Sequence, residues 1–120
     1  MSPHGEYTIE VSGNVVHVFP KGGFNAQGIE KLHEDITSLA PKNQAWVLFE
    51  HPNNTAGLTP EAVEQITQSY QRLAKQNCIA VALEISSTWQ GVFETSIVNK
   101  LDIPVLLNSK PDVLEAKIKV

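Results

Sequence analysis

The chain has 120 residues and a formal net charge of −4 at pH 7, with 42% hydrophobic and 18% charged residues. This length suits one globular domain spanning residues 1–120, and the apolar content is too high for a disordered segment. The acidic balance argues against nucleic acid as a partner, because phosphate contacts require a clustered basic face. Cys78 is the only cysteine, which excludes an internal disulfide and a thiolate zinc cluster and indicates a small core residue.

The first residues, Met1 to Glu6, lack the basic and apolar regions of a signal peptide. No apolar run approaches the roughly 18 residues needed to cross a bilayer. We therefore expect a cytoplasmic protein without a transmembrane segment.

Two β-rich runs open the chain. Residues 7–11 alternate between apolar and polar side chains, and a second run covers residues 14–19 after a Ser-Gly pair. This pattern is typical of an antiparallel hairpin, which Pro20 and the Gly22-Gly23 pair are expected to end.

The next segment has apolar residues at helical spacing. It predicts a helix from Asn25 or Ala26 to Leu39, with Asn25 as the N-cap and Pro41 preventing continuation. His33 is placed near its polar face. The residues expected to be buried are Ile29, Leu32, Ile36 and Leu39.

Residues 45–50 form an almost continuous apolar run, which indicates a strand covered on both faces in a largely parallel sheet. A polar loop is expected over residues 51–58, and Thr59-Pro60 is a favourable start for a second helix. Ligand and partner sites in such sheets tend to lie beyond the carboxyl ends of the strands, where this loop is placed.

A buried strand over residues 79–85 follows, then a third helix from Trp89 to about Lys100, a strand over residues 105–107 and a short helix starting near Ser109 and running through Ala116. The order is β-β-α-β-α-β-α-β-α. Connections of helical length imply parallel, right-handed crossovers, so the predicted fold class is α/β with a mixed, mostly parallel sheet.

No phosphate-binding loop, nucleophile elbow or zinc-protease motif is present. Glu50 and Glu84, near the ends of two strands, could approach each other across a parallel ladder. His51 is the only histidine placed where functional groups tend to gather. Because no nucleophile–base pair can be assembled and no two histidines have the spacing of a helical metal site, we predict no enzyme activity, no cofactor and no metal.

The stretch Asn54-Thr55-Ala56-Gly57-Leu58 is more informative. A hydroxyl next to a helix N-terminus is well placed to carry a phosphate, whose charge the helix end would stabilise. Together with the element order, this stretch resembles the STAS domain, the fold of SpoIIAA-like anti-sigma-factor antagonists.

Members of that family carry an Asp-Ser-Ser/Thr-Gly-Leu type of sequence at this junction, and a partner kinase phosphorylates the first hydroxyl residue. The resemblance makes Thr55 the phospho-acceptor candidate, with Asn54 in place of the Asp and Ala56 in place of the second hydroxyl, while Gly57 and Leu58 match. These departures favour a divergent member that keeps the fold without the kinase switch, in which Thr55 is a turn residue bonded to nearby backbone. The stretch from Trp89 to Phe93 resembles the third helix of the family.

Two functions remain open. The first is a non-enzymatic regulatory domain that binds a protein partner through a loop containing Asn53, Asn54, Gly57 and Leu58 and through the outer edge of the second helix, with Glu61, Glu64, Gln65 and Gln68. The alternative is a module that binds a small apolar or lipid-like ligand at Trp89 and Phe93, although these residues could simply pack on the sheet. An exposed first strand makes a dimer possible.

Overall fold

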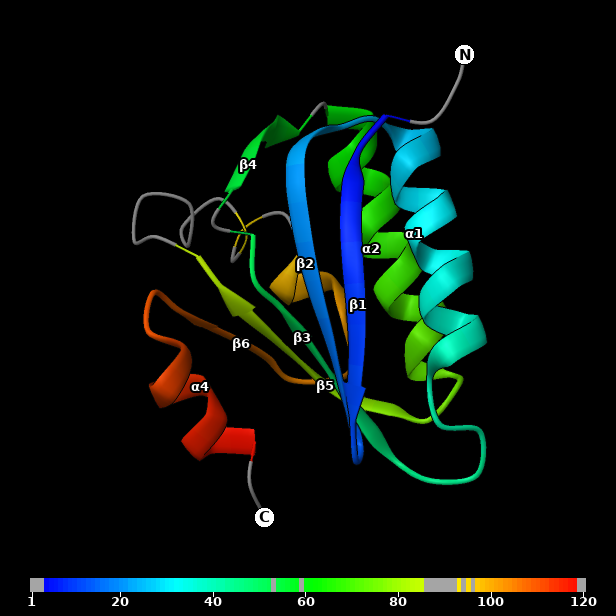
Figure 1. Cartoon of the computed structure of the whole chain (residues 1–120), viewed down its shortest axis with the longest axis vertical. Coiled ribbons are helices and arrows are strands. Elements are labelled where there is room, and N and C mark those ends of the chain that lie inside the picture. Colours follow the sequence, from blue (N-terminus) through cyan, green and yellow to red (C-terminus); the bar gives the residue numbers. More distant parts are fainter. Residues whose placement is uncertain are drawn as a thin grey trace.

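The structure is a computed structural model that describes residues 4–52, 54–58, 60–85, 93, 95 and 97–118, with 54–58 described by their backbone alone. Its sheet runs in the order β1-β2-β3-β5-β6, and β4 pairs with β2 off this path (Figure 1). Among the described strands, only β1 and β2 pair antiparallel, which confirms the predicted mixed, mostly parallel sheet. The strands are β1 (Glu6–Ser12), β2 (Val15–Phe24), β3 (Trp46–Glu50), β4 (Asn54–Leu58), β5 (Cys78–Glu84) and β6 (Val105–Asn108).

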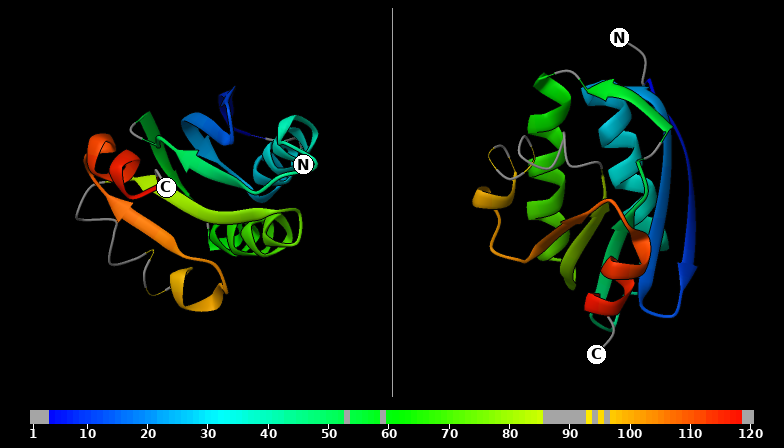
Figure 2. Two further views of the ribbon diagram at one scale, coloured as in Figure 1. Left: turned by 90° about the horizontal axis from the view of Figure 1, so that it is seen from below. Right: turned by 90° about the vertical axis from the view of Figure 1, so that its left-hand side faces the viewer.

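The helices lie on both faces of the sheet. The helices α1 (Ala26–Leu39) and α2 (Pro60–Ala74) pack side by side, and α4 (Pro111–Ile118) packs against β5 and β6 apart from that pair (Figure 2). A short 3-10 turn, η1 (Val98–Lys100), precedes β6. None of the helices in the described part of the chain is long and apolar enough to span a membrane.

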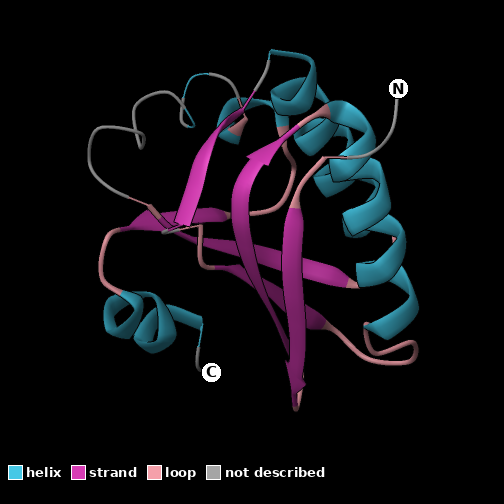
Figure 3. Cartoon of the chain, turned by 45° about the horizontal axis from the view of Figure 1, so that its top comes forward, coloured by secondary structure: helices cyan, strands magenta, loops and turns pink. Residues whose placement is uncertain are grey.

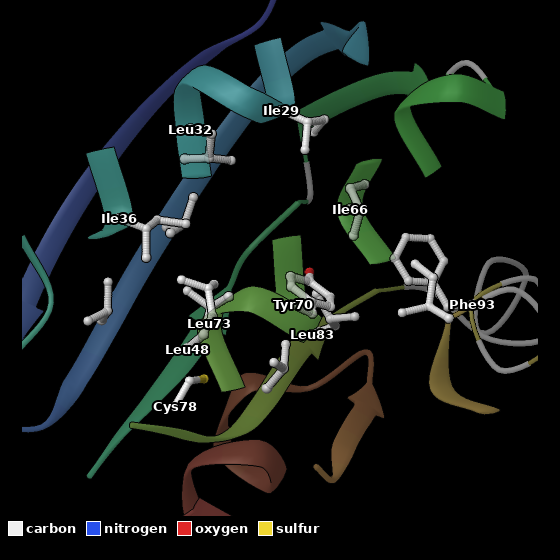
Figure 4. Close-up of a cluster of buried hydrophobic side chains, with 14 of the residues drawn as sticks. Ile29, Leu32, Ile36, Leu48, Ile66, Tyr70, Leu73, Cys78, Leu83 and Phe93 are labelled. Carbon is white, nitrogen blue, oxygen red and sulfur yellow. The ribbon is translucent and has the colours of Figure 1, made fainter. Parts of the chain in front are cut away.

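The central strand β3 is buried on both faces, as its apolar sequence predicts. Leu48 belongs to the large core cluster with α1 and α2, part of which Figure 4 shows. The next residue, Phe49, points to the other face, where it packs with Ala82 of β5 and Leu114 of α4. Successive side chains of a strand alternate between faces, so β3 joins the two cores.

The start of α1 is confirmed. The Asn25 side chain accepts a hydrogen bond from the Gly28 amide at 2.8 Å, as an N-cap residue does. A Cβ at Gly28 would come within 1.9 Å of the His4 carbonyl oxygen, so close packing explains a glycine in the first turn. The predicted burial of Leu39 is wrong: its exposure is 53%, because the helix ends there and Ala40 packs into the core instead.

The prediction for His33 is also wrong, because this residue is buried between α1 and α2. Its Nδ1 lies 2.7 Å from the Ser69 hydroxyl. Beside this pair, Arg72 of α2 donates to Glu30 of α1 at 2.7 Å. Because α2 packs against α1, the buried face of α1 is wider than its apolar stripe. The spacing of apolar residues predicts the stripe and does not reveal this extra burial.

The predicted end of the hairpin at Pro20 is wrong, since β2 continues to Phe24. Its first half pairs with β3 from Val15 to Val18, and its second half pairs with β4 from Lys21 onward. Pro20 lies between these two pairings, where β2 changes neighbour on this side and the missing amide breaks no ladder there. Gly22 has φ 76° and marks a register shift, so the glycines form an irregularity within the strand and do not end it.

The C-terminal part follows the prediction for the last strand and the last helix, whereas the predicted third helix ends in the 3-10 turn η1 over Val98–Lys100. β6 and α4 are present, and the Asn108 side chain accepts from the Lys110 amide at 2.9 Å just before α4. Of the predicted third helix, the amide of Ile97 donates to the Phe93 carbonyl at 2.8 Å, the bond of a helical turn. Trp89 lies outside the described residues.

Candidate functional site

The stretch predicted as a loop before α2 is a strand in the structure. Residues 54–58 form β4, which runs parallel to the second half of β2 (Figures 1 and 3). In register, Asn54 pairs with Lys21, Thr55 with Gly22, Gly57 with Gly23 and Leu58 with Phe24. The predicted loop is therefore wrong for these residues, and Asn53 lies outside the described part.

The reason is the length of β2. Once β3 has ended at Glu50, the remaining half of β2 still has backbone donors and acceptors on this side that require partners. The chain supplies them by returning along β2 as β4, so backbone pairing overrides the loop tendency of Asn and Gly. The helix α2 then begins at Pro60, which places Thr55 in the strand that precedes the helix.

Glu50 is the last residue of β3, and its side chain lies on the face of the sheet that α2 covers. The Tyr70 hydroxyl of α2 donates to its Oε2. Burial raises the pKa of Glu50 to about 7, although the bond from Tyr70 opposes this shift. The sheet thus carries a carboxyl group that changes charge near neutral pH.

The only cysteine lies in the same core. Cys78 is buried at the start of β5, and burial raises the pKa of its thiol to about 11. A thiol that stays protonated is a poor nucleophile, so the structure agrees with a core residue.

The expected approach of Glu50 to Glu84 does not occur. Glu50 pairs with Leu83 across the ladder, so the two carboxylates point to opposite faces of the sheet. Glu84 is buried on the α4 face, where its Oε2 lies 3.6 Å from His51 Nδ1. A difference of one residue in register separates the two acids.

On that face His51 is the centre of a cluster that also contains His17, Phe19, Phe49 and Glu84, which we call the His51 cluster. His17 Nδ1 lies 3.0 Å from His51 Nε2. The ring of His51 stacks on Phe49 at 4.3 Å and on Phe19 at 4.5 Å between centroids. Burial lowers the pKa of His51, and the nearby Glu84 carboxylate opposes that shift.

The His51 cluster lies where the parallel strands end, because the carboxyl ends of β3 and β5 supply His51 and Glu84. The His51 amide donates to the Val18 carbonyl at 2.8 Å, which continues the β2–β3 register and aligns His51 with Phe19. Chemically, two imidazoles and a carboxylate in contact can pass a proton between them or share a cation.

The prediction singled out His51 and missed His17. The two residues are 34 positions apart, and their contact depends on the β2–β3 register, which the sequence does not specify. The sequence contains one signal for this contact. His17 comes two residues after Val15 on an alternating strand, so the two side chains point to the same face of the sheet. Among the described residues, no group of three or more His, Cys, Asp or Glu side chains is arranged to hold a metal ion.

Of the two residues predicted to line an apolar pocket, Phe93 is buried in the large core cluster (Figure 4). This burial agrees with packing on the sheet. The binding of an apolar ligand stays a prediction.

The arrangement of these elements matches solved structures. An anti-sigma factor antagonist, SpoIIAA in its unphosphorylated form, superposes with a TM-score of 0.65 over 94% of this chain and 97% of its own, at 13% identity. The chain has a SpoIIAA-like fold.

Two further structures share this SpoIIAA-like fold. An anti-sigma factor antagonist from Mycobacterium paratuberculosis has a TM-score of 0.65 over 94% of this chain and 93% of its own, at 16% identity. A protein of the DUF3478 family from Shewanella loihica PV-4, described as having a SpoIIAA-like fold, has the same TM-score at 13% identity, covering 95% of this chain and 94% of its own. No protein-family model and no curated protein sequence matches the chain.

Proposed function

We propose that this chain is a non-enzymatic regulatory domain that acts by binding a protein partner. The observation that carries the proposal is the fold shared with two anti-sigma factor antagonists over 94% of the chain. A shared fold alone does not determine function, so the proposal has to name a surface and a test.

The proposed surface consists of β4 and the outward side of α2. Within the described sheet β4 pairs with β2 alone, so its other edge has backbone groups that a partner segment could bond. On α2, the side chains of Glu61, Glu64 and Gln68 are exposed. Gln65 points elsewhere, because it donates to Glu30 of α1 at 2.5 Å.

The exposed acids of α2 favour a partner with a basic surface, since complementary charge speeds association and excludes wrong partners. Glu61 and Glu64 are one turn apart on the helix and present their charges together. Thr55, on the neighbouring strand, is the candidate site at which a phosphate of about −1.5 to −2 charge would change this surface.

A pull-down from native lysate followed by mass spectrometry tests the partner. The bait proteins are the wild type, the double variant Glu61→Lys/Glu64→Lys, and Glu115→Lys as a charge-reversal control at an exposed position of α4. We expect a protein that the wild type and the control retain and the double variant loses. Retention by all three baits, or by none, would contradict the proposed surface.

The phosphorylation step has its own test. Incubation with candidate serine/threonine kinases and intact mass measurement should show the gain of one phosphate that Thr55→Ala abolishes. If no kinase modifies the wild type, the domain binds its partner without this switch, and the pull-down decides the rest of the proposal.

The alternative of a small apolar ligand predicts a co-purified adduct in native mass spectrometry of freshly prepared protein. A clean mass of the chain alone would count against it. We place the regulatory function first because Phe93 packs within the core.

A further inference from the structure

We propose that His17 and His51 form a binding site for one divalent transition-metal ion of the zinc and copper type, with Glu84 orienting His51. This site lies on the sheet face opposite α1 and α2, and it is independent of the proposed partner surface on β4 and α2.

The first support is the spacing of the two nitrogens. His17 Nδ1 and His51 Nε2 lie 3.0 Å apart. Two nitrogens that each lie about 2.0–2.1 Å from a zinc ion, at an angle of about 90–110°, are about 2.8–3.4 Å from each other. The ion would take the place of the proton that the two rings share, with His51 held in place and the partly exposed His17 ring turning and shifting to direct its lone pair at the ion.

The second support is the carboxylate behind His51. Glu84 Oε2 lies 3.6 Å from Nδ1, the nitrogen on the opposite side of the ring from His17. A histidine that binds a metal through one nitrogen commonly donates its other N–H to a carboxylate, which sets the tautomer and orients the ring. With Glu84 in this role, Nε2 of His51 keeps its lone pair on the side of His17.

The third support is the rigidity of the His51 ring. Phe49 and Phe19 stack on it with interplanar angles of 7° and 10°. Phe49 is fully buried, so one side of the ring rests on a packed core residue. A ligand whose ring is already oriented loses less conformational entropy when it binds.

The charges around the pair also favour a cation. Glu84 faces His51 from β5, Glu115 acts on it electrostatically from α4, and Glu10 of β1 pairs with His17.

Two imidazoles leave coordination positions for water or for a side chain of another molecule. His17 and His51 are partly exposed, so the pair is accessible from the surface. Imidazole ligands suit zinc, copper and nickel, and magnesium and calcium prefer oxygen ligands. We therefore expect selectivity for the first group.

Calorimetric titration of the metal-free protein with zinc chloride tests the site. The wild type should bind one ion per chain, and His17→Gln and His51→Gln should each weaken binding at least tenfold. Glu84→Gln should weaken it about tenfold, as loss of a carboxylate behind a ligand does. His4→Gln is the matched control, because His4 is exposed near the N-terminus, and its binding should equal that of the wild type.

Nitrogen-15 NMR of the wild-type imidazoles keeps the test valid if a variant fails to fold. Zinc should shift His17 Nδ1 and His51 Nε2, and magnesium should shift neither. Zinc binding that is lost in His4→Gln, or shifts confined to His4 and His33, would overturn the proposal. The absence of any zinc binding by the folded wild type would overturn it equally.

Discussion

Glu50, the last residue of β3, and the next residue, His51, show that one step along the chain decides which face of the sheet a side chain occupies. Their side chains leave the end of the strand in opposite directions, so one acid lies under α2 and one imidazole lies on the α4 face. Each is therefore partly buried beside a different partner. The two groups titrate in separate environments although they are adjacent in sequence.

We predict that Glu50→Gln removes a pH dependence from stability. The pKa of Glu50 rises from 4.5 to about 7 in the folded state, so its contribution to stability is complete below about pH 4.5 and is lost as the pH rises through 7. Gln keeps an oxygen that accepts from Tyr70. Because Glu50 keeps some exposure, we expect the variant to gain about 2 kcal/mol on the wild type between pH 4.5 and 7.5.

Urea denaturation of both proteins at several pH values measures this difference. Stability curves that run parallel across the whole range would show that Glu50 is not held in its neutral form.

His33 and Ser69 form a buried pair that connects α1 to α2. Ser69→Ala leaves a ring nitrogen of His33 without this partner, so we expect a loss of about 1–3 kcal/mol in the free energy of unfolding. Ser38→Ala is the control, because Ser38 is exposed on α1 and should change stability by less than about 0.5 kcal/mol. Equal effects of the two substitutions would mean that the buried bond contributes nothing.

Among the strands, β2 organises the sheet, because it pairs with three other strands. It has β1 on one side, and β3 followed by β4 on the other. The change of neighbour occurs at Pro20 and is followed by the register shift at Gly22. A bulge of this kind re-aims a strand without ending it.

We predict that Gly22→Ala destabilises the protein by about 1–2 kcal/mol, because φ 76° is unfavourable for an L side chain. A Cβ at Gly22 meets no atom of the described residues within 4 Å, so we attribute the loss to backbone conformation. Gly22→Asn should recover part of the loss, since Asn tolerates this region. Thermal denaturation of the wild type and the two variants gives their order of stability. A Gly22→Asn protein no more stable than Gly22→Ala would refute the explanation.

The helices and strands with strong periodicity were predictable from the sequence. The central strand β3 and the cap of α1 at Asn25 depend on local residues, and both were predicted correctly. β4 was not, because Asn54 to Leu58 forms a strand only through pairing with the distant second half of β2. The same holds for the site: His51 could be singled out by position, but its contacts with His17 and Glu84 come from the register of three strands.

In the whole molecule, the two faces of the sheet have unequal cores. The large cluster lies under α1 and α2, while the small one on the other face contains Phe49, Ala82 and Leu114 as its fully buried members. α4 therefore depends on Leu114 for its attachment to the sheet.

We predict that Leu114→Ala lowers the free energy of unfolding by about 2–4 kcal/mol, since it empties the contact with Phe49. The matched control is Leu39→Ala on the exposed end of α1, which should change stability by less than about 0.5 kcal/mol. Denaturant titration measures both. A loss in Leu114→Ala no larger than in the control would mean that α4 is not held by this side chain.

The raised pKa of Glu50, the acid beneath α2, also affects the measured heat of unfolding. At pH 7 the unfolded chain holds almost no proton on Glu50, whereas the folded chain holds about half of one, so folding takes up about half a proton from the surrounding buffer. The heat of unfolding in a calorimeter at this pH therefore contains a share of the buffer's own ionisation enthalpy, and it differs between phosphate and Tris.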